Sequence, residues 1–332
     1  MRILILGGGG FLGQKLAGAL LARGHLNCQD IAQITLADLT SPPVLPADIA
    51  VTTLPVDITD AVQTDTLISS EEGGGWDVIY HLAAVVSGQA EAEFDTGMTV
   101  NLMGSLNVFE SARRLGARTG TRPILVFTSS IAVYGGEMPA PIEDHFMTNP
   151  QTSYGAQKAA AELILTDMSR KGFLDGRGLR LPTISIRPGK PNAAASGFMS
   201  SIFREPLQGM EARSPVSPDY HHWYLSPRRV IDNLIHAAEV KADALGTQRC
   251  FVLPGRLHRL GDMVEQMRAI AGDAPCELIR WERDPEVEKI VLGWLQVEVN
   301  AAKALALGFK ADESFADNIR YFLEDDIQRP DI

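Results

Sequence analysis

Short, continuously apolar segments alternate with longer segments of helical periodicity along much of the chain. Arg2 to Leu6 is apolar without alternation, which is typical of a parallel strand buried on both faces. A helical pattern follows from Gln14 to Arg23, and similar pairs recur up to an apolar run from Leu181 to Arg187. This order predicts an α/β fold with a doubly wound parallel sheet of the Rossmann type. Further strands are expected at 34–37, 51–54, 76–84 and 124–128, and long helices at 98–115 and 153–170.

The first apolar run leads directly into a glycine-rich turn. Gly7, Gly10 and Gly13 have the spacing G-x-x-G-x-x-G between the predicted strand and the predicted helix. Glycine permits the tight turn and lets phosphate oxygens approach backbone N–H groups at the helix N-terminus. The glycines alone would fit a flexible turn as well as a phosphate-binding turn. The choice between these two interpretations depends on the next strand.

That next strand ends in a carboxylate. Asp38 lies about 25 residues beyond Gly13, where a carboxylate accepts hydrogen bonds from an adenosine ribose. No arginine follows Asp38 to receive a 2′-phosphate, so the expected cofactor is NAD and not NADP. The alternative for Asp38 is a cap at the strand end.

Two later segments suit the same ligand. Asp57-Ile58 follows a predicted strand in a position suited to an adenine edge. The strand that begins at Trp76 ends in Leu82-Ala83-Ala84, whose small side chains would let the backbone lie against a dinucleotide. His81 in this strand fits a structural histidine better than a ligand.

Candidate chemistry appears between Phe127 and Lys158. Ser129 and Ser130 end an apolar run, and Tyr154 and Lys158 are one helical turn apart on a predicted helix. An ammonium beside a phenol favours the phenolate, which would make Tyr154 usable as a base near neutral pH. A nearby serine hydroxyl can then hold the substrate oxygen.

Composition and charge exclude several other classes of protein. The net charge of the 332 residues is -11, with no basic block, which argues against nucleic-acid binding. Three scattered cysteines indicate reduced thiols and a cytoplasmic location. We expect neither a signal peptide nor a membrane span. Adjacent His221 and His222 have no third ligand at metal spacing, so no metal is expected.

Taken together, these segments resemble the extended short-chain dehydrogenase/reductase family of NAD-dependent epimerases and dehydratases. The resemblance is carried, in the family's order, by Gly7-x-x-Gly10-x-x-Gly13, Asp38, Asp57-Ile58, His81-Leu82-Ala83-Ala84, Asn101, Ser129-Ser130 with Val133-Tyr134-Gly135, Tyr154-x-x-x-Lys158 and Arg187-Pro188. It implies that Tyr154 is the general acid/base, that Ser130 assists it, and that Lys158 binds the nicotinamide ribose and lowers the Tyr154 pKa. Ser129 is the second choice for the hydroxyl. The cofactor-binding residues that it implies are Gly7, Gly10, Phe11, Leu12, Gly13, Asp38, Asp57, Ile58, Leu82, Ala83, Ala84, Asn101, Tyr154 and Lys158.

The chain departs from the sugar-nucleotide members of the family after Arg187-Pro188, where those members carry an Asn-Val-Tyr-Gly-Pro type of segment. Pro182 through Leu207 is similar to the D-erythronate dehydrogenases, a branch that oxidises a four-carbon sugar acid with NAD. Segment 221–230 also lacks the pattern in which sugar-nucleotide members carry a diphosphate-binding arginine. The expected substrate-binding residues are Ser130, Tyr154, Lys190, Asn192, Ser196 and Arg204. The last four offer donors to an anion. For Arg204, an ion pair with Glu205 is an equally good alternative.

The expected organisation is a NAD-binding domain with a smaller substrate lobe. We assign residues 1–188 and 221–248 to the first, and residues 189–220 and 249–332 to the second. The resemblance implies a homodimer paired through the helices at 98–115 and 153–170. Two other functions remain open: a nucleotide-sugar epimerase or dehydratase, and a non-catalytic protein that senses a dinucleotide.

Overall fold

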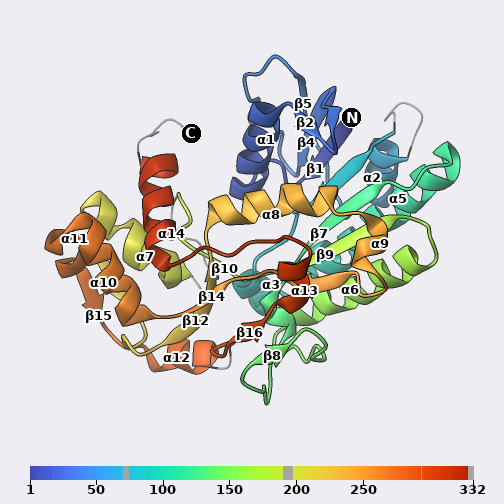
Figure 1. The fold of residues 1–332 in the computed structure, drawn as a ribbon. Helices are drawn as coiled ribbons and strands as arrows, with labels where there is room; N and C mark the ends of the chain where they lie inside the picture. Colours follow the sequence, from blue (N-terminus) through green and yellow to red (C-terminus); the bar gives the residue numbers. More distant parts are fainter. Residues whose placement is uncertain (70–74, 190–196, 293, 328–332) are drawn as a thin grey trace.

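A seven-stranded parallel sheet forms the centre of the molecule, with the strand order β13-β9-β7-β6-β1-β4-β5 (Figure 1). The computed structural model describes residues 1–69, 75–189, 197–292 and 294–327. The sheet strands are β1 Arg2–Leu6, β4 Gln33–Asp38, β5 Ala50–Pro55, β6 Val78–His81, β7 Ile124–Ser130, β9 Asp175–Leu181 and β13 Cys250–Val252. This arrangement confirms the predicted doubly wound fold.

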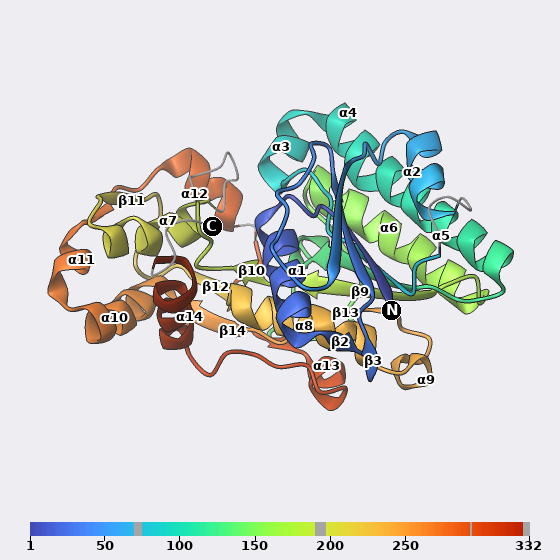
Figure 2. The same cartoon turned by 90° about the horizontal axis from the view of Figure 1, so that it is seen from above.

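Helices cover both faces of this sheet (Figure 2). Ile3 and Ile5 of β1 pack into the core beneath α1 and α8, whereas Leu4 and Leu6 pack into the core beneath α2, α5 and α6. Burial on both faces is the reason for the continuous apolar run in β1. The flanking helices are α1 Phe11–Arg23, α2 Ala61–Ile68, α3 Ser87–Ala92, α4 Phe94–Gly97, α5 Ser105–Thr119, α6 Ser153–Arg170, α8 Pro227–Glu239, α9 Ala242–Leu245 and α13 Ala302–Ala306.

The prediction of a sheet strand at 181–187 is wrong in its position. The sheet strand is β9, and the chain leaves the sheet after Leu181. The sequence pattern does not reveal β9, because the strand contains glycines. Glycine is needed there because neighbouring side chains occupy the space that a Cβ would fill. A Cβ on Gly176 would lie 2.6 Å from Ser169 Oγ, and a Cβ on Gly178 would lie 2.4 Å from Cys250 Sγ. Close packing therefore favours glycine here over the β-branched residues that mark strands.

A second, smaller body lies beside the large sheet (Figure 2). Its three-stranded sheet has the order β10-β12-β14, and its own apolar cluster includes Phe203, Tyr224, Met263 and Phe315. The strands and helices of this region are β10 Thr183–Ile184, β11 Ala212–Ser214, β12 His221–Leu225, β14 Arg256–Arg259, β15 Ile279–Trp281, α7 Phe198–Arg204, α10 Leu260–Ala271, α11 Asp273–Glu277, α12 Pro285–Leu292 and α14 Phe315–Phe322. Short pairs β2 His25–Leu26 with β3 Gln29–Asp30, and β8 Ile142–Glu143 with β16 Val299–Asn300, complete the fold.

The expected lobe boundary needs one correction. Residues 250–252 were assigned to the substrate lobe, but β13 pairs with β9 at the edge of the large sheet. The predicted division into two lobes otherwise stays a prediction.

No helix in the described ranges is both long and apolar enough to cross a membrane. Within the same ranges, no three His, Cys, Asp or Glu side chains come together as a metal site would require. Cys28 is exposed, and Cys250 and Cys276 are buried as free thiols.

Candidate active site

The glycine turn after β1 is shaped by close contacts of the backbone. Gly7 has φ +82°, and a Cβ on it would lie 2.7 Å from the backbone nitrogen of Ala83. A Cβ on Gly13 would lie 2.3 Å from the Gly7 carbonyl oxygen. α1 begins immediately after Gly10, and no side chain caps its N-terminus. The turn thus leaves helix N–H groups uncapped beside a backbone without side chains, as dinucleotide phosphates require.

Asp38 lies at the end of β4 beside this turn. Its carboxylate accepts hydrogen bonds from the Gly9 N–H at 3.0 Å and from the Leu39 N–H at 2.8 Å. Asp57 is in the turn after β5, where its carboxylate accepts from the backbone and the hydroxyl of Thr59. These residues fit the adenosine half of NAD, and the Asp38 carboxylate would repel a 2′-phosphate.

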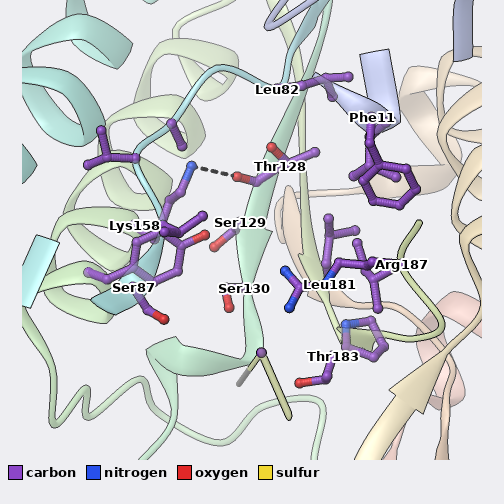
Figure 3. A pocket seen from close by; sticks show the side chains of 18 of the residues that line it. Phe11, Leu82, Ser87, Thr128, Ser129, Ser130, Lys158, Leu181, Thr183 and Arg187 are labelled. Carbon is purple, nitrogen blue, oxygen red and sulfur yellow. Dashed lines mark hydrogen bonds between the residues drawn. The ribbon is translucent and has the colours of Figure 1, made fainter. Parts of the chain in front are cut away.

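A cavity of about 450 Å³ opens at the carboxyl ends of β1, β6 and β7, the edge at which open α/β sheets bind ligands. Figure 3 shows it in close view. Phe11 and Leu12 line it from the glycine turn, Leu82 and Ala84 from the end of β6, and the 128–130 segment from the end of β7. Residues of the chain after β9, including Thr183 and Arg187, form the opposite wall.

The three predicted catalytic residues line this cavity together. Thr152 caps α6 by accepting from the Gly155 N–H, which places Tyr154 in the first turn of the helix. Ser130, at the end of β7, lies beside the Tyr154 phenol and lowers its pKa. Lys158 is almost fully buried, donates to the Thr128 carbonyl at 2.9 Å, and lies 5.7 Å from the centre of the Tyr154 ring. The serine, the tyrosine and the lysine therefore come together as the sequence predicted.

Ser129 and Ser130 have different hydrogen-bond partners. The Ser129 hydroxyl donates to Glu162 Oε1 at 2.5 Å, and Glu162 also holds the guanidinium of Arg180 at 2.6 Å. Arg180 donates in turn to the Tyr134 hydroxyl at 2.7 Å. Ser129 thus belongs to a buried polar network, which leaves Ser130 as the hydroxyl for chemistry.

The electrostatic expectation for Tyr154 is wrong in this structure. Burial raises the pKa of Tyr154 to about 12, and the hydrogen bond from Ser130 opposes that rise. Burial also lowers the pKa of Lys158 to about 7, while the Glu162 carboxylate opposes that fall. Desolvation disfavours both charged forms, so Lys158 alone does not bring the phenol toward neutral pH.

Asn101 and His81 have structural roles. The Asn101 side chain is fully buried, accepts from the Val85 N–H at 2.9 Å and donates to Gln157 at 2.9 Å. It orders the loop after β6, and its predicted contact with the cofactor stays a prediction. His81 is buried beside Phe127 and pairs with the Ser105 hydroxyl at 2.9 Å. Burial lowers the pKa of His81 to about 3, so the imidazole is neutral.

Among the predicted anion donors, only Arg204 lies in the described ranges; Lys190, Asn192 and Ser196 lie outside them. Arg204 lines the cavity but is buried, forms an ion pair with Glu205 at 2.6 Å and donates to the Arg187 carbonyl at 3.0 Å. The ion-pair alternative for Arg204 is therefore realised. Its charge is largely balanced within the protein.

The sequence pattern predicts no role for Arg187, although the Arg187-Pro188 pair is part of the family resemblance. The Arg187 side chain extends into the cavity, and no residue in the described part of the chain forms an ion pair or a side-chain hydrogen bond with it. Burial and the neighbouring charge of Arg204 lower its pKa. A half-buried cation with a like charge beside it is a favourable site for an anion. In the sequence, Arg187 is a single arginine after an apolar run, and this pattern is too weak to identify it as a ligand-binding residue.

The fold and this cavity define a dinucleotide-dependent enzyme that moves a proton and a hydride at a carbon bearing a hydroxyl group. Residues 3–217 match the NAD dependent epimerase/dehydratase family. The chain belongs to this family, and its cofactor is NAD. Gly7, Gly10, Gly13 and Asp38 are the residues whose geometry fits that cofactor.

Two curated relatives match almost the whole chain. A D-erythronate dehydrogenase of Cupriavidus necator is 47% identical over 98% of this chain and 98% of its own length. A D-erythronate dehydrogenase of Haemophilus influenzae is 40% identical over 98% of this chain and 100% of its own length. Among solved structures, one described as the nucleoside-diphosphate-sugar epimerase from Agrobacterium tumefaciens has a TM-score of 0.93 and 43% identity, covering 99% of this chain and 95% of that chain.

A more distant solved structure shares the fold. The GalE-like L-threonine dehydrogenase from Cupriavidus necator, in its holo form, has a TM-score of 0.83 and 24% identity, covering 98% of this chain and 99% of that chain.

Proposed function

We propose that the protein is a D-erythronate dehydrogenase, which oxidises the C2 hydroxyl of D-erythronate to 2-dehydro-D-erythronate while NAD is reduced to NADH. The identity of 47% with a relative of that name supports this assignment. The observation that carries it is a single cavity containing Ser130, Tyr154 and Lys158 together with Arg187. The first three handle the hydroxyl proton, and Arg187 provides a positive charge for a carboxylate.

The reaction removes one proton and one hydride from the substrate. Ser130 holds the reacting oxygen, and the Tyr154 phenolate accepts the proton of the hydroxyl group. Bound NAD would supply the acceptor for the hydride, and the positive charge of its nicotinamide would favour the Tyr154 phenolate. The Ser130 hydrogen bond also lowers the pKa of Tyr154, so it stabilises the base as well as the substrate oxygen.

Arg187 is the proposed anchor of the substrate carboxylate. With a net charge of -11, the protein as a whole opposes the approach of an anion, so a local donor has to select it. The Arg187 guanidinium is half-buried and has no ion-pair partner in the described part of the chain, which makes a charge-assisted hydrogen bond strong here. Lys190, Asn192 and Ser196 lie outside the described residues and stay predicted contributors.

A nucleotide-sugar epimerase is the second candidate, because one similar solved structure carries that description. Two arginines near the start of α8 would be candidates to hold a diphosphate, but both are in ion pairs. Arg228 binds Asp325 at 2.6 Å and Glu324 at 2.8 Å, and Arg229 binds Asp232 at 3.0 Å. This pairing favours the small acid over the sugar nucleotide.

Absorbance of NADH separates the two candidates. The purified protein should form NADH with D-erythronate and NAD, and Tyr154→Phe should abolish nearly all of it. An epimerase releases no net NADH, so conversion of a nucleoside-diphosphate sugar without NADH formation, together with inactivity toward D-erythronate, would refute the dehydrogenase assignment.

We also propose that two chains pair through α5 and α6. Leu163 and Ile164 of α6 are 70% and 41% exposed, and Met103, just before α5, is 50% exposed. Apolar side chains gathered on neighbouring helices fit a surface covered by a second copy. The two-lobed organisation and the cytoplasmic location stay predictions.

A further inference from the structure

The cavity at the catalytic residues continues into a second, smaller cavity of about 120 Å³. Ser87, Ser130, Tyr154 and Thr183 line both. Lys158, Arg187 and Arg204 line only the larger one, whereas the described lining of the smaller one contains no Asp, Glu, Lys or Arg. The charged end of a substrate therefore fits the larger cavity, and an uncharged end fits the smaller one.

This division orients a hydroxy acid across the site. If the carboxylate binds Arg187, the adjacent C2 lies toward Ser130 and Tyr154, and the remainder of the carbon chain extends into the smaller cavity. In D-erythronate that remainder carries two hydroxyl groups. They need hydrogen-bond partners there, because a polar group buried without a partner is costly.

Thr183 and His222 provide such a partner on the wall of the smaller cavity. Thr183 Oγ1 lies 2.7 Å from His222 Nε2, and His222 is buried in β12 with 2% of its surface exposed. Burial lowers the pKa of His222 to about 4, so the ring is neutral and carries one N–H. The position of that hydrogen decides what Thr183 offers to a ligand.

The hydrogen belongs on Nδ1. The Tyr220 hydroxyl lies 3.5 Å from Nδ1 and donates its own proton to the Val291 carbonyl at 3.1 Å, so toward His222 it can only accept. With Nδ1 protonated, Nε2 accepts, and the Thr183 hydroxyl donates its proton to Nε2. The lone pairs of Thr183 Oγ1 then remain for a ligand.

We infer that Thr183, oriented by His222, accepts a hydrogen bond from a substrate hydroxyl beyond C2 and so selects polyhydroxy acids over simple 2-hydroxy acids. This inference rests on the proposed function, since it concerns the same substrate. Thr183 is the specificity-determining residue, and His222 is the positioning residue that keeps it an acceptor.

A cycle of two variants and two substrates tests the inference. Thr183→Val keeps the shape of the side chain and removes the acceptor, while Thr183→Ser keeps the hydroxyl. The substrates are D-erythronate and the 2-hydroxybutanoate of the same configuration at C2, which has the same carbon chain without the other two hydroxyls. Thr121→Val is the matched control, because Thr121 is exposed and precedes the amino end of β7, whereas the cavity lies at the carboxyl end of that strand.

Thr183→Val should lower kcat/KM for D-erythronate about tenfold, the scale of one lost hydrogen bond that leaves its partner unsatisfied, and should change the value for 2-hydroxybutanoate less than about twofold. Thr183→Ser should restore most of the discrimination. His222→Phe should lower the ratio of the two kcat/KM values in the same direction. If turnover of 2-hydroxybutanoate is too slow to measure, its inhibition constant as a competitive inhibitor of D-erythronate oxidation replaces kcat/KM.

An equal loss for both substrates, or no loss with D-erythronate, would overturn the role of Thr183 while leaving the dehydrogenase assignment intact. No NADH formation from D-erythronate by the unmodified protein would overturn both. The unmodified protein is therefore measured first.

Discussion

Replacing Arg187 by methionine should raise the Michaelis constant for D-erythronate about 10- to 150-fold. The Arg187 side chain lines the cavity and has no ion-pair partner in the described ranges, so the substrate carboxylate would supply its hydrogen bond. Hydrogen bonds to charged groups contribute about 1.5–3 kcal/mol, and each 1.4 kcal/mol corresponds to tenfold in affinity. The constant for NAD should change little, because the predicted phosphate site lies at Gly7 to Gly13.

The same change should not destabilise the fold. Burial and Arg204 already lower the pKa of Arg187, so its charge is unfavourable until an anion binds. The midpoint of thermal unfolding of Arg187→Met should therefore stay constant or rise, whereas loss of a paired buried arginine would lower it. Arg213→Met is the matched control, since the Arg213 side chain is 72% exposed and lies 3.2 Å from Glu282. It should change neither quantity.

The assay is initial-rate NADH formation with D-erythronate and with its uncharged amide. Arg187→Met should lower kcat/KM for the acid and leave that for the amide nearly constant. If both substrates lose equally, Arg187 shapes the cavity and does not bind the carboxylate. If neither loses, the carboxylate lies elsewhere, and the predicted donors Lys190, Asn192 and Ser196 become the next positions to change.

Four further predictions concern the base, its pH dependence, the cofactor and the assembly. Tyr154→Phe should lower turnover about 10²–10⁴-fold while NAD still binds, as measured by rates and by calorimetry. Ser130→Ala should move the acid limb of the kcat/KM profile to higher pH, because Tyr154 must lose its proton to act and the Ser130 hydrogen bond lowers its pKa; an unshifted limb would remove Ser130 from this role. Asp38→Ala should narrow the preference for NAD over NADP, and equal efficiency of the unmodified enzyme with both would contradict the assigned role. Leu163→Glu should convert a dimer into monomers in sedimentation experiments, and a dimer that persists would place the interface elsewhere.

Local sequence determined much of this protein. The glycine spacing predicted the turn at Gly7 because a positive φ and close backbone contacts are properties of one short segment. Tyr154 and Lys158 were predicted together because a helix brings residues four apart onto one face. The alternation of apolar runs and helical patterns predicted the parallel sheet, since each element carries its own periodicity. The similarity to dehydrogenases of sugar acids was also evident in the run from Pro182 through Leu207.

The tertiary structure decided the features that depend on contacts between distant segments. Ser129 and Ser130 are neighbours in the chain, but only the fold brings Glu162 to Ser129 and leaves Ser130 beside Tyr154. The position predicted for the strand β9 was wrong because side chains from α6 and β13 leave no room for a Cβ, so β9 carries glycines in place of typical strand residues.

The spacing of residues in the sequence likewise could not predict the electrostatics of the site. A motif brings an ammonium near a phenol, but burial sets the cost of charging either group, and burial is the sum of contacts from many elements. For the same reason, two features appear only in the folded chain: the lack of an ion-pair partner for Arg187 among the described residues, and the pairing of Thr183 with His222. Short-range geometry is encoded in neighbouring residues, whereas desolvation and hydrogen-bond partners are properties of the whole packed structure.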